Sequence, residues 1–174
     1  MLSQASQIID KFNASMGKFI AYATILMAII TFAIVVLRYG FNVGWIAMQE
    51  SVTYLHAAVF LLGSAFTYQQ DGHVRVDVFY RKMSATKQTC LNLAGCILFM
   101  LPVSAYISLI CWHYVAESWS VFEGSREAGG LPFTYVLKSF LLVFSISMLL
   151  QAISEIIKHT LTLMRNNMQQ TGKQ

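Results

Sequence analysis

The chain has 174 residues, of which 56% are hydrophobic and only 11% are charged, whereas about 25% of the residues in soluble proteins are charged. This composition predicts a single-domain integral membrane protein and excludes the soluble classes. The formal net charge is +4, and because the basic residues form no stripe, no nucleic-acid partner is expected.

The N-terminal part predicts an amphipathic segment followed by a membrane span. Apolar residues recur at helical spacing over residues 6–18, with Asp10, Lys11 and Asn13 on the opposite side. This segment is either a short amphipathic helix at the membrane surface or a helical extension of the first span. The first span is expected at about 17–38, an uncharged run long enough to cross a bilayer.

The next connection and the second span carry the first candidate site residues. Residues 38–45 contain two glycines and an asparagine, which favour a turn. The second span is expected at about 46–69, with Gly63 among small residues that let helices approach closely. Arg38 and Glu50 flank the turn, so we expect them to form an ion pair that orients the surface used by a partner.

A polar hinge, residues 69–80, separates the second and third spans. Asp71 and Gly72 form a turn dipeptide, in which the glycine is expected to take a positive φ. His73 and an alternating, extended pattern follow, made by Val74, Arg75, Val76, Asp77 and Val78. The charges of this pattern are expected to meet lipid headgroups or a partner, with an ordinary solvated turn as the alternative.

The third and fourth spans are expected at about 85–116 and 132–158. Pro102 should kink the third span, and Pro132 suits the first turn of the fourth. Lys138 lies two turns inside the fourth span, so it either reaches the headgroups or pairs with an acid.

A polar stripe on the fourth span is the last structural feature of the sequence. Its members recur at intervals of three and four residues, and they are Ser147, Gln151, Ser154, Glu155 and Lys158. Because lipid cannot satisfy an amide or a carboxylate, the stripe is expected to face protein, either the bundle, a large partner subunit or both, with Gln151 deepest. The alternative is that Glu155 and Lys158, near the membrane boundary, simply reach water.

The basic residues predict the orientation of the four spans. Nine lie in the N-terminal segment, the hinge region and the tail: Lys11, Lys18, Arg75, Arg81, Lys82, Lys87, Lys158, Arg165 and Lys173. Three lie in or beside the other two connections: Arg38, Arg126 and Lys138. The positive-inside rule therefore predicts that both termini and the hinge are cytoplasmic.

The residues alone indicate an accessory membrane subunit without catalytic, cofactor or metal residues. No charged residue lies in the middle of a span, and no Ser/His/Asp arrangement shares a location. The three cysteines, Cys90, Cys96 and Cys111, fit neither a zinc site nor a redox pair and are interpreted as packing residues. The alternative is a haem-bearing electron-transfer subunit, with His56 and His113 at similar depth as axial ligands.

The chain also resembles the small membrane subunit of TRAP (tripartite ATP-independent periplasmic) transporters, the DctQ-like small permease family. The likeness covers roughly residues 15 to 160 and rests on residues 37–42, Trp45, Glu50, 60–65, 71–77, 130–132 and Lys138. The most specific motif is Asp71-Gly72-His73-Val74-Arg75-Val76-Asp77 within a four-span chain of this length.

This resemblance implies a scaffold role in the bacterial inner membrane. The family's large, DctM-like membrane subunit, expected here as a separate chain, holds the sodium and substrate sites. A periplasmic substrate-binding protein delivers an organic anion. Lipid is the remaining partner. The candidate interface or structural residues are Arg38, Glu50, Gly63, Asp71, Gly72, His73, Arg75, Asp77, Pro132, Lys138 and Gln151.

Overall fold

A computed structural model of the chain describes residues 2–73 and 77–171, and the described regular structure is helical throughout. Its elements are α1 (Leu2–Phe41), α2 (Ile46–Gln69), α3 (Asp77–Tyr80), α4 (Ala85–Gly95), a π-helical segment η1 (Cys96–Met100), α5 (Leu101–Ser120) and α6 (Thr134–Thr171). Four continuous stretches are long and apolar enough to cross a membrane: Ser3–Phe41, Ile46–Gln69, Ala85–Ser120 and Thr134–Asn166. The predicted all-helical fold with four spans is confirmed.

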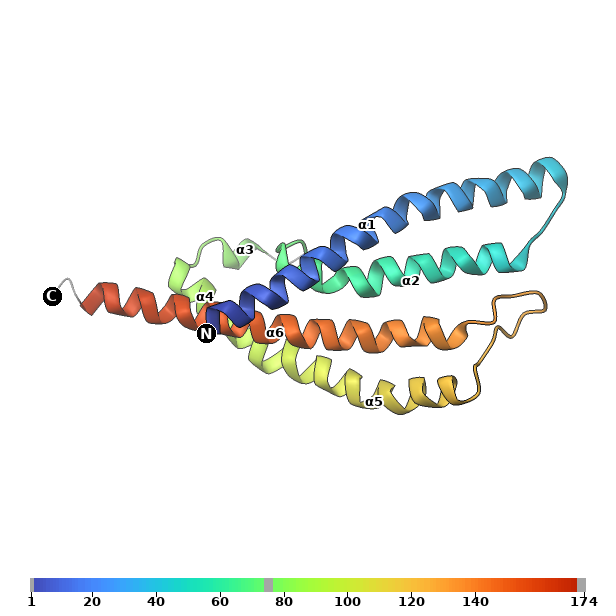
Figure 1. Cartoon of the computed structure of the whole chain (residues 1–174). Helices are drawn as coiled ribbons and strands as arrows, with labels where there is room; N and C mark the ends of the chain where they lie inside the picture. Colours follow the sequence, from blue (N-terminus) through green and yellow to red (C-terminus); the bar gives the residue numbers. More distant parts are fainter. Residues whose placement is uncertain (1, 74–76, 172–174) are drawn as a thin grey trace.

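The four long helices form a layer with α2 and α6 in the middle and α1 and α5 on the outside (Figure 1). The first turns of α1, the last turns of α6 and the short helix α3 lie at one end of the molecule, which we call the terminal end. The connections 42–45 and 121–133 lie at the other, the loop end. Toward the loop end α1 diverges from α6, whereas near the terminal end the two helices cross in contact.

Helix α1 begins at Leu2 and continues without a break to Phe41, so the N-terminal segment is an extension of the first span and no separate surface helix forms. Forty helical residues extend about 60 Å, twice the roughly 30 Å of a hydrocarbon core. Gly17 marks the closest approach to α2, because a Cβ there would lie 2.2 Å from Cγ of Phe66. By contrast, Gly63 has open space around it, so it is not a close-approach residue within this chain.

The third span contains the π-helical segment directly before Pro102. Proline lacks an N–H and its ring clashes with the carbonyl four residues earlier, here that of Leu98. A π turn widens the helix at this point, and such single turns are a recognised cause of helix bending. The expected effect of Pro102 on the helix is therefore a local π-helical segment, and the third span remains one continuous helix.

Three helix ends use a non-glycine residue in the left-handed region: Asn42, Asp71 and Phe122. At the end of α2, Gly72 N–H donates to Thr67 O at 2.9 Å and Asp71 N–H donates to Tyr68 O at 3.0 Å. This is the Schellman pattern, with Asp71 in the position usually taken by glycine. The prediction of a positive φ at Gly72 is thus wrong by one residue: Asp71 has φ 56°.

Two other local predictions need correction. Asp77 and Val78 begin the short helix α3 and do not continue an extended strand; Val74, Arg75 and Val76 lie outside the described residues. Helix α6 begins at Thr134, so Pro132 lies in the preceding connection and not in the first helical turn. Proline fits there because the 121–133 connection needs no backbone donor from that residue.

The described residues bury a small apolar core: Ile20, Ala58, Ala65, Cys96, Val115 and Ala152. Many large apolar side chains on α1 and α5 are exposed instead, and the most apolar window of α1 contains no buried residue. Lipid or a protein partner must cover these faces, since a thin helical layer cannot bury them internally.

Candidate functional site

The polar stripe of α6 lies against the N-terminal third of α1 at the terminal end. Asn13 donates to Gln151 Oε1 at 2.8 Å, and the hydroxyls of Ser6 and Ser154 are 2.7 Å apart. Ser6, Asn13, Gln151 and Ser154 are buried, with Asn13 and Gln151 at 0% exposure. These contacts pair polar residues at helical spacing on one helix with polar residues at helical spacing on the other.

Charged groups complete this arrangement, which we call the terminal-end cluster: Ser6, Asp10, Asn13, Gln151, Ser154, Glu155 and Lys158. Lys158 Nζ lies 2.7 Å from Asp10 Oδ2 and 2.8 Å from Glu155 Oε1. Asp10 Oδ1 accepts from Ser154 at 2.8 Å, so one carboxylate joins two α6 residues. Because the buried polar groups of Ser6, Asn13, Gln151 and Ser154 find their partners across this contact, the cluster favours the crossing of α1 over α6 at this point.

Two buried oxygens beside the cluster have no hydrogen-bond partner among the described residues: Asn13 Oδ1 and Gln69 Oε1. Gln69 reaches α1 through its other amide atom, since its Nε2 donates to Asp10 O at 3.1 Å. The end of α2 is thus connected to the same turn of α1 that meets α6.

A second polar group, the loop-end cluster, consists of Glu50, Ser118, Glu123, Ser125 and Lys138 together with the Leu131 N–H. Glu50 accepts a short hydrogen bond from Ser125, and its other oxygen accepts from Leu131 N–H at 2.6 Å. A Cβ at Gly130 would lie 2.8 Å from Glu50 Oε1, so glycine gives the loop room beside this carboxylate. Glu50 therefore holds the 121–133 connection onto α2.

Lys138 pairs with an acid, which is one of the two alternatives that the sequence predicts for it; the other is a position at the headgroups. Its ammonium group contacts Glu123 and lies 4.0 Å above the centre of the Tyr114 ring. Glu123 also accepts from Ser118 at 2.7 Å. The hydrogen bonds from Lys138 and then Ser118 hold the pKa of Glu123 below its usual value, since both favour the ionised form.

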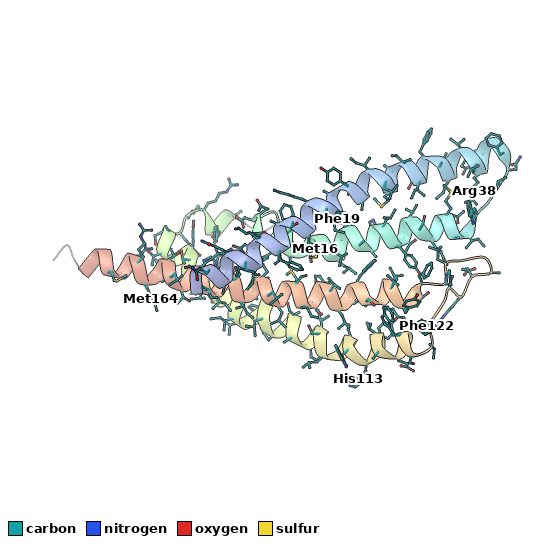
Figure 2. The ribbon with its side chains drawn as sticks, in the orientation of Figure 1. Met16, Phe19, Arg38, His113, Phe122 and Met164 are labelled. Carbon is teal, nitrogen blue, oxygen red and sulfur yellow. The ribbon has the colours of Figure 1, made fainter. Side chains whose placement is uncertain are left out.

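The expected Arg38–Glu50 ion pair does not form. Arg38 is exposed at the loop end of α1, where Figure 2 labels it, while Glu50 is engaged by the 121–133 connection. The prediction is wrong because Glu50 lies within α2 and accepts hydrogen bonds from a loop more than seventy residues later in the chain.

The two histidines considered as haem ligands are not arranged for that role. His56 is exposed on α2, with its ring 4.8 Å from that of Phe60. His113 is exposed on α5 and points away from the other helices in Figure 2. Axial ligands must face one cofactor from opposite sides. Since α6 lies between α2 and α5, the electron-transfer alternative is not supported.

The remaining candidate residues lie apart from one another. Gly63 lies within α2 and Pro132 lies at the loop end. His73 is exposed at the terminal end, and its ring centre lies 5.8 Å from that of Tyr68. The backbone of Asp77 is in α3, and Arg75 is outside the described residues. The candidates among the described residues thus do not form a single site.

Sequence reasoning missed the contact between α1 and the α6 stripe, and it missed Ser125 and Leu131 as partners of Glu50. A signal for the first was present, because Ser6, Asp10 and Asn13 recur at intervals of four and three. That spacing matches the α6 stripe and could have indicated the pairing. No signal identified the loop partners, since one is a backbone amide.

Comparisons with known proteins agree with this architecture. Residues 27–162 match the family described as "Tripartite ATP-independent periplasmic transporters, DctQ component". A Haemophilus influenzae protein named "Putative TRAP transporter small permease protein" is 32% identical over 99 residues, which cover 56% of this chain and 56% of the relative. The match thus spans about half the length of that relative, and no solved structure matches the chain.

The family match covers most of the chain: it includes the second and third spans in full, most of the fourth, and the last part of the first, Ser3–Phe41. A transporter component of this family associates in general with a large membrane subunit and a binding protein. Together with the four apolar helices, the match indicates a multi-pass inner-membrane protein. The chain belongs to the DctQ family, the small membrane component of tripartite ATP-independent periplasmic transporters.

Proposed function

We propose that this chain is a non-catalytic scaffold subunit that supports a separate large TRAP membrane subunit. The assembled transporter takes up an organic anion that a periplasmic binding protein delivers. A sodium gradient drives this uptake. In this proposal both termini are cytoplasmic, because nine of the twelve basic residues lie in the N-terminal segment, the hinge region and the tail of the sequence.

The observation that carries the scaffold role is the exposed apolar face of α1. Its most apolar window contains no buried residue, although the terminal-end cluster holds its first turns against α6. Large side chains populate this face: Phe19, Tyr22, Ile25, Ile29 and Phe32. A helix that packs on α2 with one face and exposes large apolar side chains on another widens the layer, and it offers a long surface to a second membrane protein.

Cysteine cross-linking tests whether this face meets the large subunit. In a chain whose three native cysteines are replaced, single cysteines at Ile25 and Phe32 on α1 are expected to cross-link to the co-expressed large subunit. The matched positions are Tyr106 and Leu109, which are equally exposed on the other outer helix α5. Cross-links confined to α5 would contradict the proposed α1 interface.

Proteoliposomes test the transport role directly. Uptake of the anion is expected only when the large subunit, this chain, the binding protein and an inward sodium gradient are all present. Full uptake by the large subunit without this chain would refute an essential scaffold function.

Maleimide labelling of intact cells tests the orientation. A cysteine at Glu127, in the 121–133 connection, should react with an impermeant reagent, and one at Met164, near the end of α6, should not. The reverse result would invert the proposed topology without affecting the family assignment.

A further inference from the structure

A cavity of about 460 Å³ lies at the loop end, between the last turn of α1 and the first turn of α2. Its lining residues are Arg38, Tyr39, Asn42, Gly44, Ile46 and Gln49. Arg38, labelled in Figure 2, follows the buried Ile20 by about five helical turns, so the two share one side of α1. Phe32, on the exposed face proposed for the large subunit, is rotated from Arg38 by about 120°. The cavity is therefore separate from that face.

The described lining of this cavity carries a positive charge and no acid. Among the residues that the structure describes, no carboxylate pairs with the Arg38 guanidinium. The side-chain amides of Asn42 and Gln49 likewise make no hydrogen bond within the described chain, so both can donate to a ligand. The other loop-end cavity is lined by acids and bases together: Glu50, Glu123, Glu127, Arg126 and Lys138. The Arg38 cavity thus favours an anion.

The position of Arg38 along α1 matches the depth of lipid phosphates. Residues 19–37 carry no charge, and a helix of that length extends about 28 Å, close to the roughly 30 Å of a hydrocarbon core. Arg38 is the first charged residue after this run, so it lies at the boundary of the core. Tyr39 and Trp45 are exposed beside it, and such aromatic residues are typical of the headgroup level.

Apolar side chains continue from the cavity toward the membrane interior. Val35 lies one turn before Arg38 on the same side of α1, and it is exposed. Ile46, in the lining itself, is also exposed. A molecule with an anionic group at Arg38 can therefore place a hydrocarbon chain beside these residues.

We propose that this cavity binds the phosphate group of one phospholipid. The Arg38 guanidinium donates two parallel hydrogen bonds to phosphate oxygens, and the amides of Asn42 and Gln49 donate to the same group. An acyl chain extends along Val35 into the bilayer. Because the recognised group is the phosphate, a diacylglycerol with a sugar headgroup does not satisfy the site.

Arg38 provides the first set of variants. Arg38→Gln removes the charge and the guanidinium fork, whereas Arg38→Lys keeps the charge and loses the fork, so its effect should be intermediate. The matched control is Arg126→Gln, which removes the same charge from an exposed arginine of the loop end that lines the other cavity.

Gly44 provides a second, steric test. A Cβ at Gly44 would meet nothing within 4 Å, so Gly44→Leu introduces a side chain at the cavity without a clash. Gly40→Leu is its control, because Gly40 is also open but does not line this cavity.

The full-length chain is purified in mild detergent with any bound partner. It is equilibrated with phosphatidylglycerol or with monogalactosyl diacylglycerol of identical acyl chains, and retained lipid is counted by mass spectrometry. We expect the wild type to retain phosphatidylglycerol in preference to the galactolipid. Retention of phosphatidylglycerol should fall by about tenfold in Arg38→Gln and Gly44→Leu, because hydrogen bonds to a charged group are lost or blocked, but not in either control.

Circular dichroism establishes that each variant is folded before lipid is counted. Equal retention of both lipids by the wild type would overturn phosphate recognition, and equal retention by Arg38→Gln and Arg126→Gln would overturn the site. If Arg38→Gln does not fold, Gly44→Leu compared with Gly40→Leu decides the result. Glycerol 3-phosphate, at the concentration of the lipid, should not displace phosphatidylglycerol; displacement would assign the cavity to a soluble phosphate and overturn the lipid assignment.

Discussion

The two polar clusters differ in what they connect. The terminal-end cluster joins two membrane helices, α1 and α6, through side chains that are mostly buried. The loop-end cluster joins the 121–133 connection to the ends of α2, α5 and α6, and α1 takes no part in it. Polar contacts to α6 therefore hold α1 at one end only, although α1 also packs against α2, and this agrees with the divergence of α1 from α6 toward the loop end in Figure 1.

This difference shows how a thin helical layer can be ordered with a small apolar core. Apolar side chains gain little by leaving lipid for a protein interior, so position must come from close packing and polar contacts. Both kinds of contact occur near the terminal end of α1, at Gly17 and at the terminal-end cluster. The face of α1 that is exposed along its remaining length is left available for a partner.

The largest effect is expected from Gly17→Val. Its Cβ would lie 2.2 Å from Cγ and 2.4 Å from Cβ of Phe66, atoms that cannot move without shifting the helix. Overpacking of this kind typically destabilises by about 1–3 kcal/mol, occasionally more. The free energy of unfolding, measured in mixed micelles titrated with a denaturing detergent, should fall by such an amount. Gly40→Val, at the open end of the same helix, should have little effect; equal losses would mean that the crossing is not tight.

Gln151→Leu should have the next largest effect. An interhelical hydrogen bond in a membrane protein contributes about 0.6 and up to about 1.7 kcal/mol. Here the loss should lie near the upper value, because Asn13 would be left buried with both amide atoms unpaired. The double variant Asn13→Leu/Gln151→Leu should recover much of the loss. If the two single losses simply add, the residues are not coupled.

Phe122→Gly should stabilise the loop end by about 1 kcal/mol, because a bulky residue in the left-handed conformation is strained there and glycine is not. Asp71→Gly should stabilise the terminal end less, since the short polar side chain of aspartate tolerates this region better. The same detergent titration compares them. A larger gain at Asp71 would mean that its side chain is as strained as that of Phe122.

The smallest effect concerns pH at the loop end. Because the folded-state pKa of Glu123 is lowered, its contribution to stability is present above the unfolded-state value and is lost as the pH falls through the lower folded value. Lys138→Met removes the main cause of that shift. The free energy of unfolding should therefore decrease less as the pH falls than it does in the wild type. Lys158→Met, at the other end, leaves the Glu123 contribution in place. If the free energy of unfolding of Lys138→Met decreased at low pH as much as that of the wild type, the assigned coupling between Lys138 and Glu123 would be contradicted.

Local features of the chain were predictable to different degrees. The expected second span, 46–69, coincides with α2, because charged or turn-forming residues bound it on both sides. The ends of the outer spans were predicted less well: α1 and α6 continue beyond the apolar runs through amphipathic turns. Such turns satisfy their own backbone hydrogen bonds, so no local signal ends the helix where the apolar run ends.

The sequence by itself determined four helices long and apolar enough to cross a membrane, because an uncharged run of about 20 residues matches the hydrocarbon core and a helix satisfies its own backbone groups in lipid. It also determined that the α6 stripe needs a protein neighbour. Only the tertiary structure decided that this neighbour is α1, that Glu50 holds a distant loop and not Arg38, and that the two histidines do not meet. The physical reason is that polarity specifies the kind of surroundings a side chain requires, whereas the choice of partner depends on which helices pack side by side.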